Sequence, residues 1–182
     1  LGAAHHNLVD LLESGKVDGW QLAGICEYPL EKTSNPISRI WQRWFAHPKR
    51  VAKEINRLVS NNQCDLVHIT DQEQGHLLPK NCPVPGIITV HDLFHLFPEH
   101  LRFSDEVIAV GDTKPGIVRR RDLQKLKAGI NRANHLLCNS KHTLEAAEQH
   151  FPTVAASRVP LGIESAKYHP ENNPPIKLDL PD

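Results

Sequence analysis

The stretch GIITVHD, residues 86–92, indicates the fold class of this chain. Its apolar run IITV is short and nearly continuous, as in a strand that is buried on both faces of a parallel sheet. The run stops abruptly at His91 and Asp92. We therefore predict a strand over residues 86–90, with two polar side chains directly after its carboxyl end.

Elements of similar character lie on both sides of this strand. Strands are predicted at residues 20–28 (WQLAGICEY), 64–70 (CDLVHIT), 135–140 (HLLCNS) and 157–163 (SRVPLGI). Helical patterns cover residues 3–15, 35–62 in two pieces, and 141–151; a loop covers 98–117 and a basic amphipathic segment 117–133. Because apolar strands alternate with helices, the predicted fold is α/β, a Rossmann-like parallel sheet with helices on both faces.

The composition is that of an ordinary globular chain. Its 182 residues suffice for one domain, and 21 lysines and arginines balance 21 aspartates and glutamates, so the net charge indicates no particular partner. No apolar run approaches the roughly 20 residues that cross a membrane, and no signal peptide is recognisable, so we expect a cytoplasmic protein. Methionine is absent even at residue 1, and we therefore expect a part of a longer protein.

An open parallel sheet binds ligands outside the carboxyl ends of its strands. The residues that follow the predicted strands are Thr70-Asp71, His91-Asp92, Asn139-Ser140 and Gly162. All are polar or glycine, although loop residues are polar by default. Ser140 also suits the N-cap of the next helix, and a helix N-terminus suits an anionic group. These positions are candidate binding residues.

Four motifs follow one another along the chain: DLVHIT (65–70), PGIITVHDL (85–93), INRANHLLCNSKHTLEAAEQHF (130–151) and SRVPLGIESAKYHP (157–170). Together they resemble the N-terminal half of GT-B glycosyltransferases of the retaining, family-4 type. Those proteins carry a strand that ends in His-Asp, a segment R-A-(D/N)-x-(I/L)-(I/L)-x-x-S that enters a helix, and a V-I-P-(N/L)-G-(I/V)-(D/E) strand. An aromatic-x-Pro triplet follows that strand, here Tyr168-His169-Pro170.

The resemblance implies a two-domain enzyme with its active site in the cleft between two Rossmann-like halves. Residues 1–170 would form the acceptor-side domain, without its first strand, and residues 171–182 the interdomain linker or the start of an absent C-terminal domain. Gly2 would remain from a glycine turn, and His5 would follow it toward the acceptor. The implied partners are a nucleotide-sugar donor, a sugar or lipid-linked acceptor and the C-terminal domain of the same chain. No cofactor is implied.

In the family, the histidine at the position of His91 points toward the donor sugar and its diphosphate. A positioned polar donor there stabilises the charge that develops as the diphosphate leaves. The structural alternative is a histidine that caps the end of the strand. Asp92 is expected to orient His91 or to fix the next loop, with a role as the acceptor's general base as the alternative.

A metal site at these histidines is not predicted. His91 and His95 are four residues apart, a spacing that puts two ligands on one face of a helix. A zinc site needs further organised ligands, for which the sequence offers only Glu99 and His100. HDLFH also lacks the HExxH pattern, and His91 is expected at the end of a strand.

The segment 114–132 contains seven lysines and arginines, Arg120 among them, and one acid, Asp122. It is either a solvated helix face or a patch for an anionic acceptor, such as a lipid phosphate or the inner membrane face that carries it. Nucleic acid is not expected as a partner, because no aromatic residues interleave with the basic ones.

The predicted function is transfer of a sugar from a nucleotide-diphosphate sugar to an acceptor hydroxyl with retention, by a hexosyltransferase-type enzyme in carbohydrate biosynthesis. The segment alone is expected to be inactive. The alternatives are a non-catalytic α/β module that binds a ligand or a partner, and a GT-B-like nucleotide-sugar epimerase. A downstream domain with a Glu-x7-Glu motif would favour the transferase.

Overall fold

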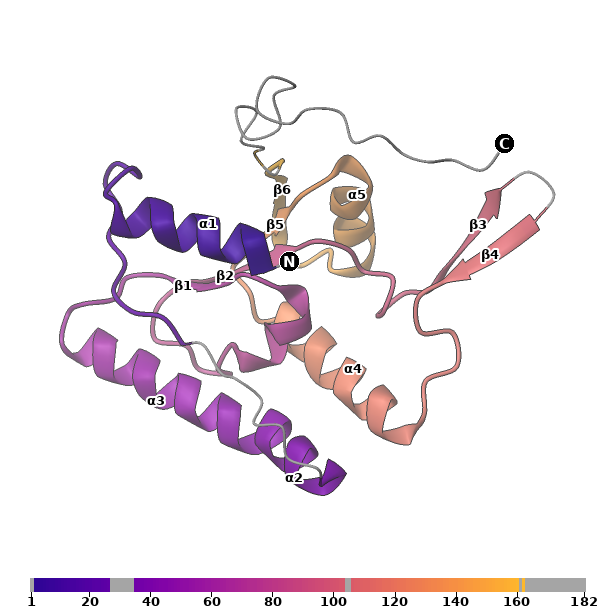
Figure 1. The fold of residues 1–182 in the computed structure, drawn as a ribbon, viewed down its shortest axis with the longest axis horizontal. Coiled ribbons are helices and arrows are strands. Elements are labelled where there is room, and N and C mark those ends of the chain that lie inside the picture. Colours follow the sequence, from indigo (N-terminus) through magenta and orange to yellow (C-terminus); the bar gives the residue numbers. More distant parts are fainter. Residues whose placement is uncertain (1, 27–34, 104–105, 161, 163–182) are drawn as a thin grey trace, which may run out of the picture.

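The computed structural model describes residues 2–26, 35–103, 106–160 and 162 (Figure 1). Several predicted features lie outside the described residues: the last two positions of the strand at 20–28, residues 161 and 163 of the strand at 157–163, the triplet Tyr168-His169-Pro170 and the linker at 171–182.

The centre of the fold is a four-stranded sheet in the order β1-β2-β5-β6, with every neighbouring pair parallel. Its strands are β1 (Val67–Ile69), β2 (Gly86–Val90), β5 (His135–Cys138) and β6 (Ala155–Arg158). Ile88 of β2 lies beside Leu136 of β5, and both are fully buried. Ile87 and Thr89, which face the other side, are only partly buried. The predicted α/β fold is thus confirmed, with one of the two sheet faces more apolar than the other.

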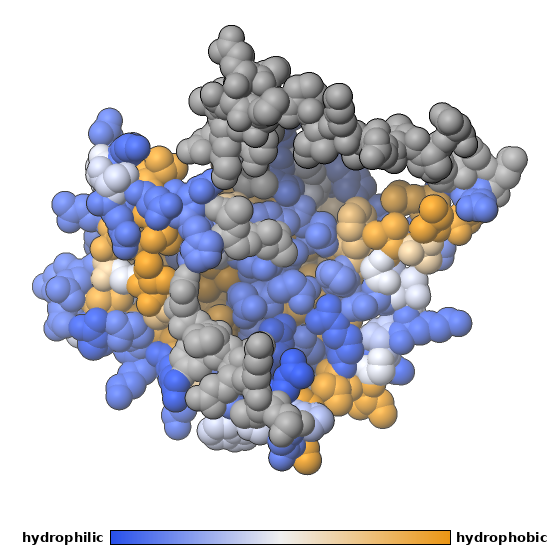
Figure 2. Space-filling view, in the orientation of Figure 1, coloured by the Kyte–Doolittle hydropathy of each residue, from blue (hydrophilic) through white to orange (hydrophobic). Residues whose placement is uncertain are grey.

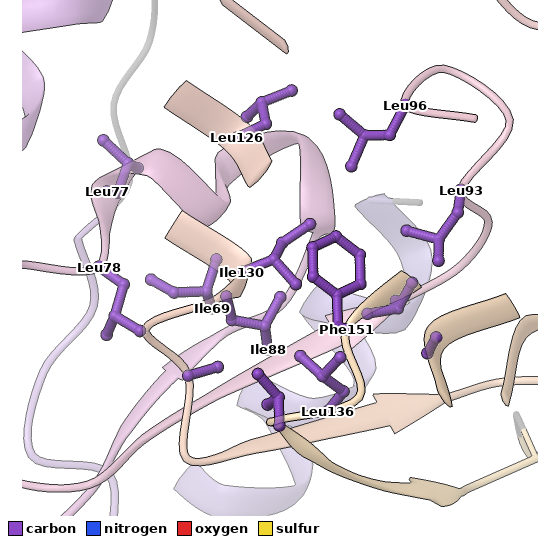
Figure 3. Close-up of a cluster of buried hydrophobic side chains, with 14 of the residues drawn as sticks. Ile69, Leu77, Leu78, Ile88, Leu93, Leu96, Leu126, Ile130, Leu136 and Phe151 are labelled. Atoms are coloured by element: carbon purple, nitrogen blue, oxygen red, sulfur yellow. The ribbon is translucent and has the colours of Figure 1, made fainter. Parts of the chain in front are cut away.

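Most helices pack on the apolar face of the sheet. α3 (His47–Ser60), the 3-10 turn η2 (Gln72–Leu77), α4 (Ile117–Ile130) and α5 (Lys141–His150) all contribute side chains to, or directly beside, one hydrophobic core. Figure 3 shows Leu126, Ile130 and Phe151 above Ile88 and Leu136. α1 (Gly2–Glu13) lies on the side of the sheet away from α3 and α4 (Figure 1). Helices therefore flank the sheet on both faces.

Backbone contact between two glycines brings α4 close to η2. A Cβ atom on Gly129 would lie 2.1 Å from the carbonyl oxygen of Gly75, closer than any real side chain could approach. The two elements therefore meet main chain to main chain, with Ile130 of α4 against Gly75. This contact fixes the position of η2, the turn that follows β1 in the chain.

The helix predictions at 3–15 and 35–62 are confirmed. α1 ends before Gly15, whose φ of +66° suits a glycine stop. The second region divides into α2 (Pro36–Trp41), a π-helical turn η1 (Gln42–Ala46) and α3, with Pro48 in the first turn of α3. Within the described chain, no helix is long and apolar enough to cross a membrane.

Other sequence expectations are wrong in their boundaries or type. Residues 20–26 form no strand. β6 begins two residues earlier than predicted, because its register is set by pairing Ala155 with His135 rather than by its own weakly apolar sequence. The predicted strand at 64–70 shortens to Val67–Ile69.

The predicted loop at 98–117 contains an antiparallel hairpin, β3 (Glu99–Phe103) and β4 (Glu106–Val110). The charges of EHLRF concealed an alternation of apolar and polar residues with the two-residue period of a strand. The hairpin extends away from the helices and the sheet (Figure 1).

Candidate functional site at the carboxyl edge of the sheet

The carboxyl end of β1 leads directly into η2. Asp71, with extended backbone, is the N-cap of this turn, and its side chain accepts a hydrogen bond from the backbone N–H of Glu73 at 2.8 Å. Gln72 follows and is buried. Asp71 therefore has a structural role in starting the turn, and it delivers Gln72 to the neighbouring strand.

His91, directly after β2, is held by two groups from the β1 side. Its backbone N–H donates to Oε1 of Gln72 at 2.9 Å, and its ring Nε2 lies 3.2 Å from the carbonyl oxygen of Thr70. A carbonyl can only accept, so Nε2 carries the proton. The other ring nitrogen, Nδ1, has no hydrogen-bond partner among the described residues.

The end of β5 approaches His91 from the other side. Ser140 is the N-cap of α5, as predicted, and its Oγ accepts from the backbone N–H of Thr143 at 3.0 Å. The Thr143 hydroxyl lies 3.2 Å from the carbonyl oxygen of His91 and 3.2 Å from Oδ1 of Asn139. Asn139, Ser140 and His91 are thus brought together through Thr143, a residue that nothing in the sequence singled out.

Asp92 does not hold His91, contrary to the sequence expectation, because Gln72 and Thr70 do so. Oδ1 of Asp92 is buried and has no hydrogen-bond partner in the described part of the chain. An unsatisfied buried acceptor costs about 1–3 kcal/mol, so its persistence calls for an explanation. A hydroxyl donor from a ligand would satisfy this oxygen.

α1 joins the site through His5. Nδ1 of His5 lies 3.1 Å from Oγ1 of Thr70 at the end of β1. Gly2 is the first residue of α1, so it belongs to a helix rather than to the glycine turn that the sequence suggested. His5 therefore lies beside the end of β1, and its contact with an acceptor stays a prediction.

His95 does not share a helix face with His91. Its Nδ1 lies 3.6 Å from Oδ2 of Asp112, a contact on the surface. Across the described ranges, no three histidine, cysteine or acidic side chains gather as potential metal ligands.

Arg120 lies apart from this edge, and its selection as a binding residue, made on the basic segment 114–132, stays a prediction. It is exposed, and its Nε donates to the carbonyl oxygen of Pro115 at 3.0 Å. The arginine that reaches toward η2 is its neighbour Arg119, whose NH1 lies 3.4 Å from Oε2 of Glu73. A helix turns about 100° per residue, so adjacent side chains point to different surfaces.

Asp122 of α4 is the centre of a buried ionic network. Its carboxylate accepts hydrogen bonds from Nε of Arg43 at 2.8 Å, from the Trp44 indole at 3.1 Å and from Arg119 at 3.0 Å. Burial alone would raise the pKa of Asp122, but the Arg43 hydrogen bond and charge leave it below its usual value. The signal in the sequence was the single acid within a basic segment.

The less apolar face of the sheet carries paired histidines and hydroxyls. His68 lies 2.8 Å from Oγ1 of Thr89, and His135 lies 2.8 Å from Oγ of Ser157. Burial, and then the nearby His5, lower the pKa of His68. This polar face ends at Thr70, where α1 covers it.

A family model described as Glycosyltransferase Family 4 matches residues 20–167. The matched range contains all four strands of the sheet and the residues around His91, and it begins after α1. Comparisons with curated proteins and with solved structures gave no match.

Proposed function

Since the chain belongs to glycosyltransferase family 4, we propose that it forms the acceptor-side half of an enzyme that transfers a sugar from a nucleotide-diphosphate sugar to an acceptor hydroxyl with retention. The observation that carries this proposal is the carboxyl edge of the sheet. There Thr70, Gln72 and Thr143 fix His91 from three directions, next to an unsatisfied carboxylate oxygen of Asp92.

Each of these groups has a task in sugar transfer. With Nε2 donating to Thr70, the His91 ring offers Nδ1 to a sugar hydroxyl as a hydrogen-bond partner. Its fixed orientation places that acceptor without a rearrangement during the reaction. Asp92 accepts a hydrogen bond from a sugar hydroxyl through Oδ1 and so orients the sugar. Its role as the general base for the acceptor is the alternative to proton transfer to the leaving diphosphate.

Retention follows from attack on the same face that the diphosphate leaves. As the glycosidic bond breaks, the sugar carbon becomes oxocarbenium-like and the departing diphosphate takes the acceptor's proton. No side chain then needs to act as a nucleophile. In this course the carboxylate of Asp92, directly beside His91, acts as a hydrogen-bond acceptor and not as a nucleophile.

The second wall of the active site belongs to another domain of the same protein. His91 and Asp92 line neither of two surface hollows, which lie against α4 instead. In the proposed enzyme, residues 1–170 provide the acceptor side, residues 171–182 lead to the donor-binding domain, and the cleft between the domains contains the chemistry. This segment alone would not catalyse transfer.

The test uses the full-length protein and follows the release of nucleotide diphosphate from a panel of UDP-, GDP- and ADP-sugars with candidate acceptors. We expect one donor to be turned over, and His91→Ala to reduce the rate by at least about 100-fold, the usual effect of losing one transition-state hydrogen bond. His95→Ala is the matched control, because His95 lies on the surface beside Asp112.

Other outcomes would redirect the proposal. Release of diphosphate together with a free, epimerised sugar would indicate the epimerase alternative. If no donor is bound or turned over with any acceptor, the binding-module alternative replaces the transferase. Equal activity of His91→Ala and His95→Ala would remove His91 from the site.

A further inference from the structure

Large apolar side chains are exposed along α2 and η1. Ile37, Trp41 and Phe45 follow one another at intervals of four residues, the spacing of one helix face. Ile37 is 76% exposed and Trp41 58% exposed, although side chains of this size normally withdraw from water. This row forms one part of an exposed apolar surface.

The N-terminal end of α4 continues the same surface. Ile117 is 83% exposed, and Val118 is exposed as well. A hollow of about 550 Å³ lies between the two parts, lined by Ile40 and Trp44 on one side and by Ile117 and Val118 on the other. Figure 2 shows apolar side chains at the lower right edge of the molecule, where Figure 1 places this end of α4.

Basic side chains border these apolar residues. The Lys125 ammonium lies 5.3 Å from the centre of the Phe45 ring and 5.6 Å from that of Trp44, and the Arg121 guanidinium lies 6.0 Å from Trp44. Arg121 and Lys125 also line a second hollow of about 610 Å³, together with Lys49 of α3. We define the aromatic–basic face as the exposed residues Ile37, Trp41, Phe45, Lys49, Ile117, Val118 and Arg121 with the partly exposed Lys125.

One acidic residue lines the hollows of this face, and it does not neutralise the positive charge of the basic side chains there. That acid, Asp122, is engaged by Arg43 and Arg119. Of the basic residues in segment 114–132, Arg132 donates to the carbonyl oxygen of Leu78 at 2.8 Å. Lys127 lies 4.1 Å from the centre of the Phe97 ring, whereas Arg121 and Lys125 reach the rings of Trp44 and Phe45.

We propose that the aromatic–basic face docks this protein on an anionic lipid bilayer. Aliphatic and aromatic side chains that project beside cations match the interface between headgroups and acyl chains, where indole rings are favoured and phosphates bind lysine and arginine. Trp41 and its apolar neighbours enter this interface, while Arg121 and Lys125 contact lipid phosphates. The proposal goes beyond glycosyl transfer and does not depend on it.

Two other occupants fit the face less well. A nucleic acid would stack its bases on the aromatic rings, but the aliphatic side chains of Ile37 and Ile117 would add little to its binding. An acidic protein would use the charge, but a specific protein interface also buries its apolar residues in a well-packed core. A bilayer accommodates projecting apolar tips without a shaped partner.

The test is co-sedimentation of the full chain with vesicles of phosphatidylcholine alone and of phosphatidylcholine mixed with phosphatidylglycerol. We expect binding to the mixed vesicles, weaker binding at high salt, and little binding to the neutral ones. Each cation near an anionic surface strengthens binding about fivefold, so Arg121→Gln with Lys125→Gln should weaken it about thirtyfold. Arg121→Lys with Lys125→Arg keeps the charge and should restore binding.

Matched controls separate docking from general charge and hydrophobicity. Lys16→Gln with Lys141→Gln removes two exposed charges away from the aromatic–basic face and should leave binding unchanged. Trp41→Ala should weaken binding about tenfold or more, because a tryptophan buries a large area at an interface. Trp20→Ala is its control, since Trp20 is similarly exposed at 54% but lies outside this face.

The proposal is overturned if the Arg121/Lys125 variant and the Lys16/Lys141 variant bind anionic vesicles equally. It is also overturned if the wild type binds neither kind of vesicle. In that case, binding of an RNA homopolymer or of poly-glutamate that depends on Arg121 and Lys125 would identify a nucleic acid or an acidic protein as the partner of this face. Circular dichroism of every variant shows whether the fold is retained. Because all these side chains are on the surface, we expect unchanged spectra.

Discussion

Acidification will destabilise this fold, and His76 will account for a large part of the loss. His76 lies in η2 between α3 and α4 and is 7% exposed. Its Nε2 donates to the carbonyl oxygen of Arg43 at 3.2 Å, and its buried Nδ1 has no hydrogen-bond partner within the described residues. Burial first, and then the positive charge of Arg43, lower the pKa of His76 from 6.5 to about 4.

The size of the effect follows from the two pKa values. Because the folded state resists protonation, the unfolded chain binds the proton first as the pH falls. Stability is therefore complete above pH 6.5 and is lost progressively down to about pH 4. At 1.36 kcal/mol for each pH unit, the loss from His76 alone is about 3 kcal/mol. Burial also lowers the pKa of His47, His68 and His150, which adds loss in the same direction.

The measurement compares wild type with His76→Gln, because glutamine can still donate to Arg43 and does not titrate. Urea unfolding followed by circular dichroism at several pH values between neutral and about 4 gives the free energy of unfolding for each protein. The wild type should lose about 3 kcal/mol more than the variant over this range. His6→Gln, at an exposed histidine, should behave as wild type. Parallel pH curves for wild type and His76→Gln would refute the assignment.

Three further predictions concern stability and are checked by the same urea unfolding. Asp122→Ala leaves two arginines without their buried carboxylate and should lower the free energy of unfolding by about 3 kcal/mol; no loss would show that water replaces the carboxylate. Gly129→Ala places a Cβ 2.1 Å from the Gly75 carbonyl oxygen, and the protein should fail to reach the native fold. Phe151→Ala empties a fully buried position and should cost about 3–5 kcal/mol, whereas Phe45→Ala on the surface should change stability by less than about 0.5 kcal/mol.

Much of the sheet could be predicted because its signals are local. The run at residues 86–90 became β2 with the predicted boundaries, and Ser140 became the N-cap of α5. A strand buried on one face and a cap that bonds three residues ahead are recognisable within a few positions of sequence. The order of motifs identified the family for the same reason.

The candidate site was predicted only in part. Placing His91, Asn139 and Ser140 at one edge follows from the parallel sheet, but Gln72 and Thr143, which hold His91, gave no signal of their own. In the sequence, Gln72 lies 19 residues and Thr143 lies 52 residues from His91, and no sequence pattern links either of them to His91. Arg120 and Arg119 reach different surfaces because one residue along a helix turns the side chain by about 100°; the binding role of Arg120 stays a prediction.

The sequence by itself determined the alternation of strands and helices, the polar ends of the strands and the membership of the family, because each depends on patterns among neighbouring residues. Only the tertiary structure decided which groups fix His91 and which arginine binds Asp122. It also revealed that Trp41 remains in water, and that Phe45 does so beside Lys125. Such contacts depend on how helices distant in sequence pack on the sheet, and that packing is set by the whole core rather than by any one segment.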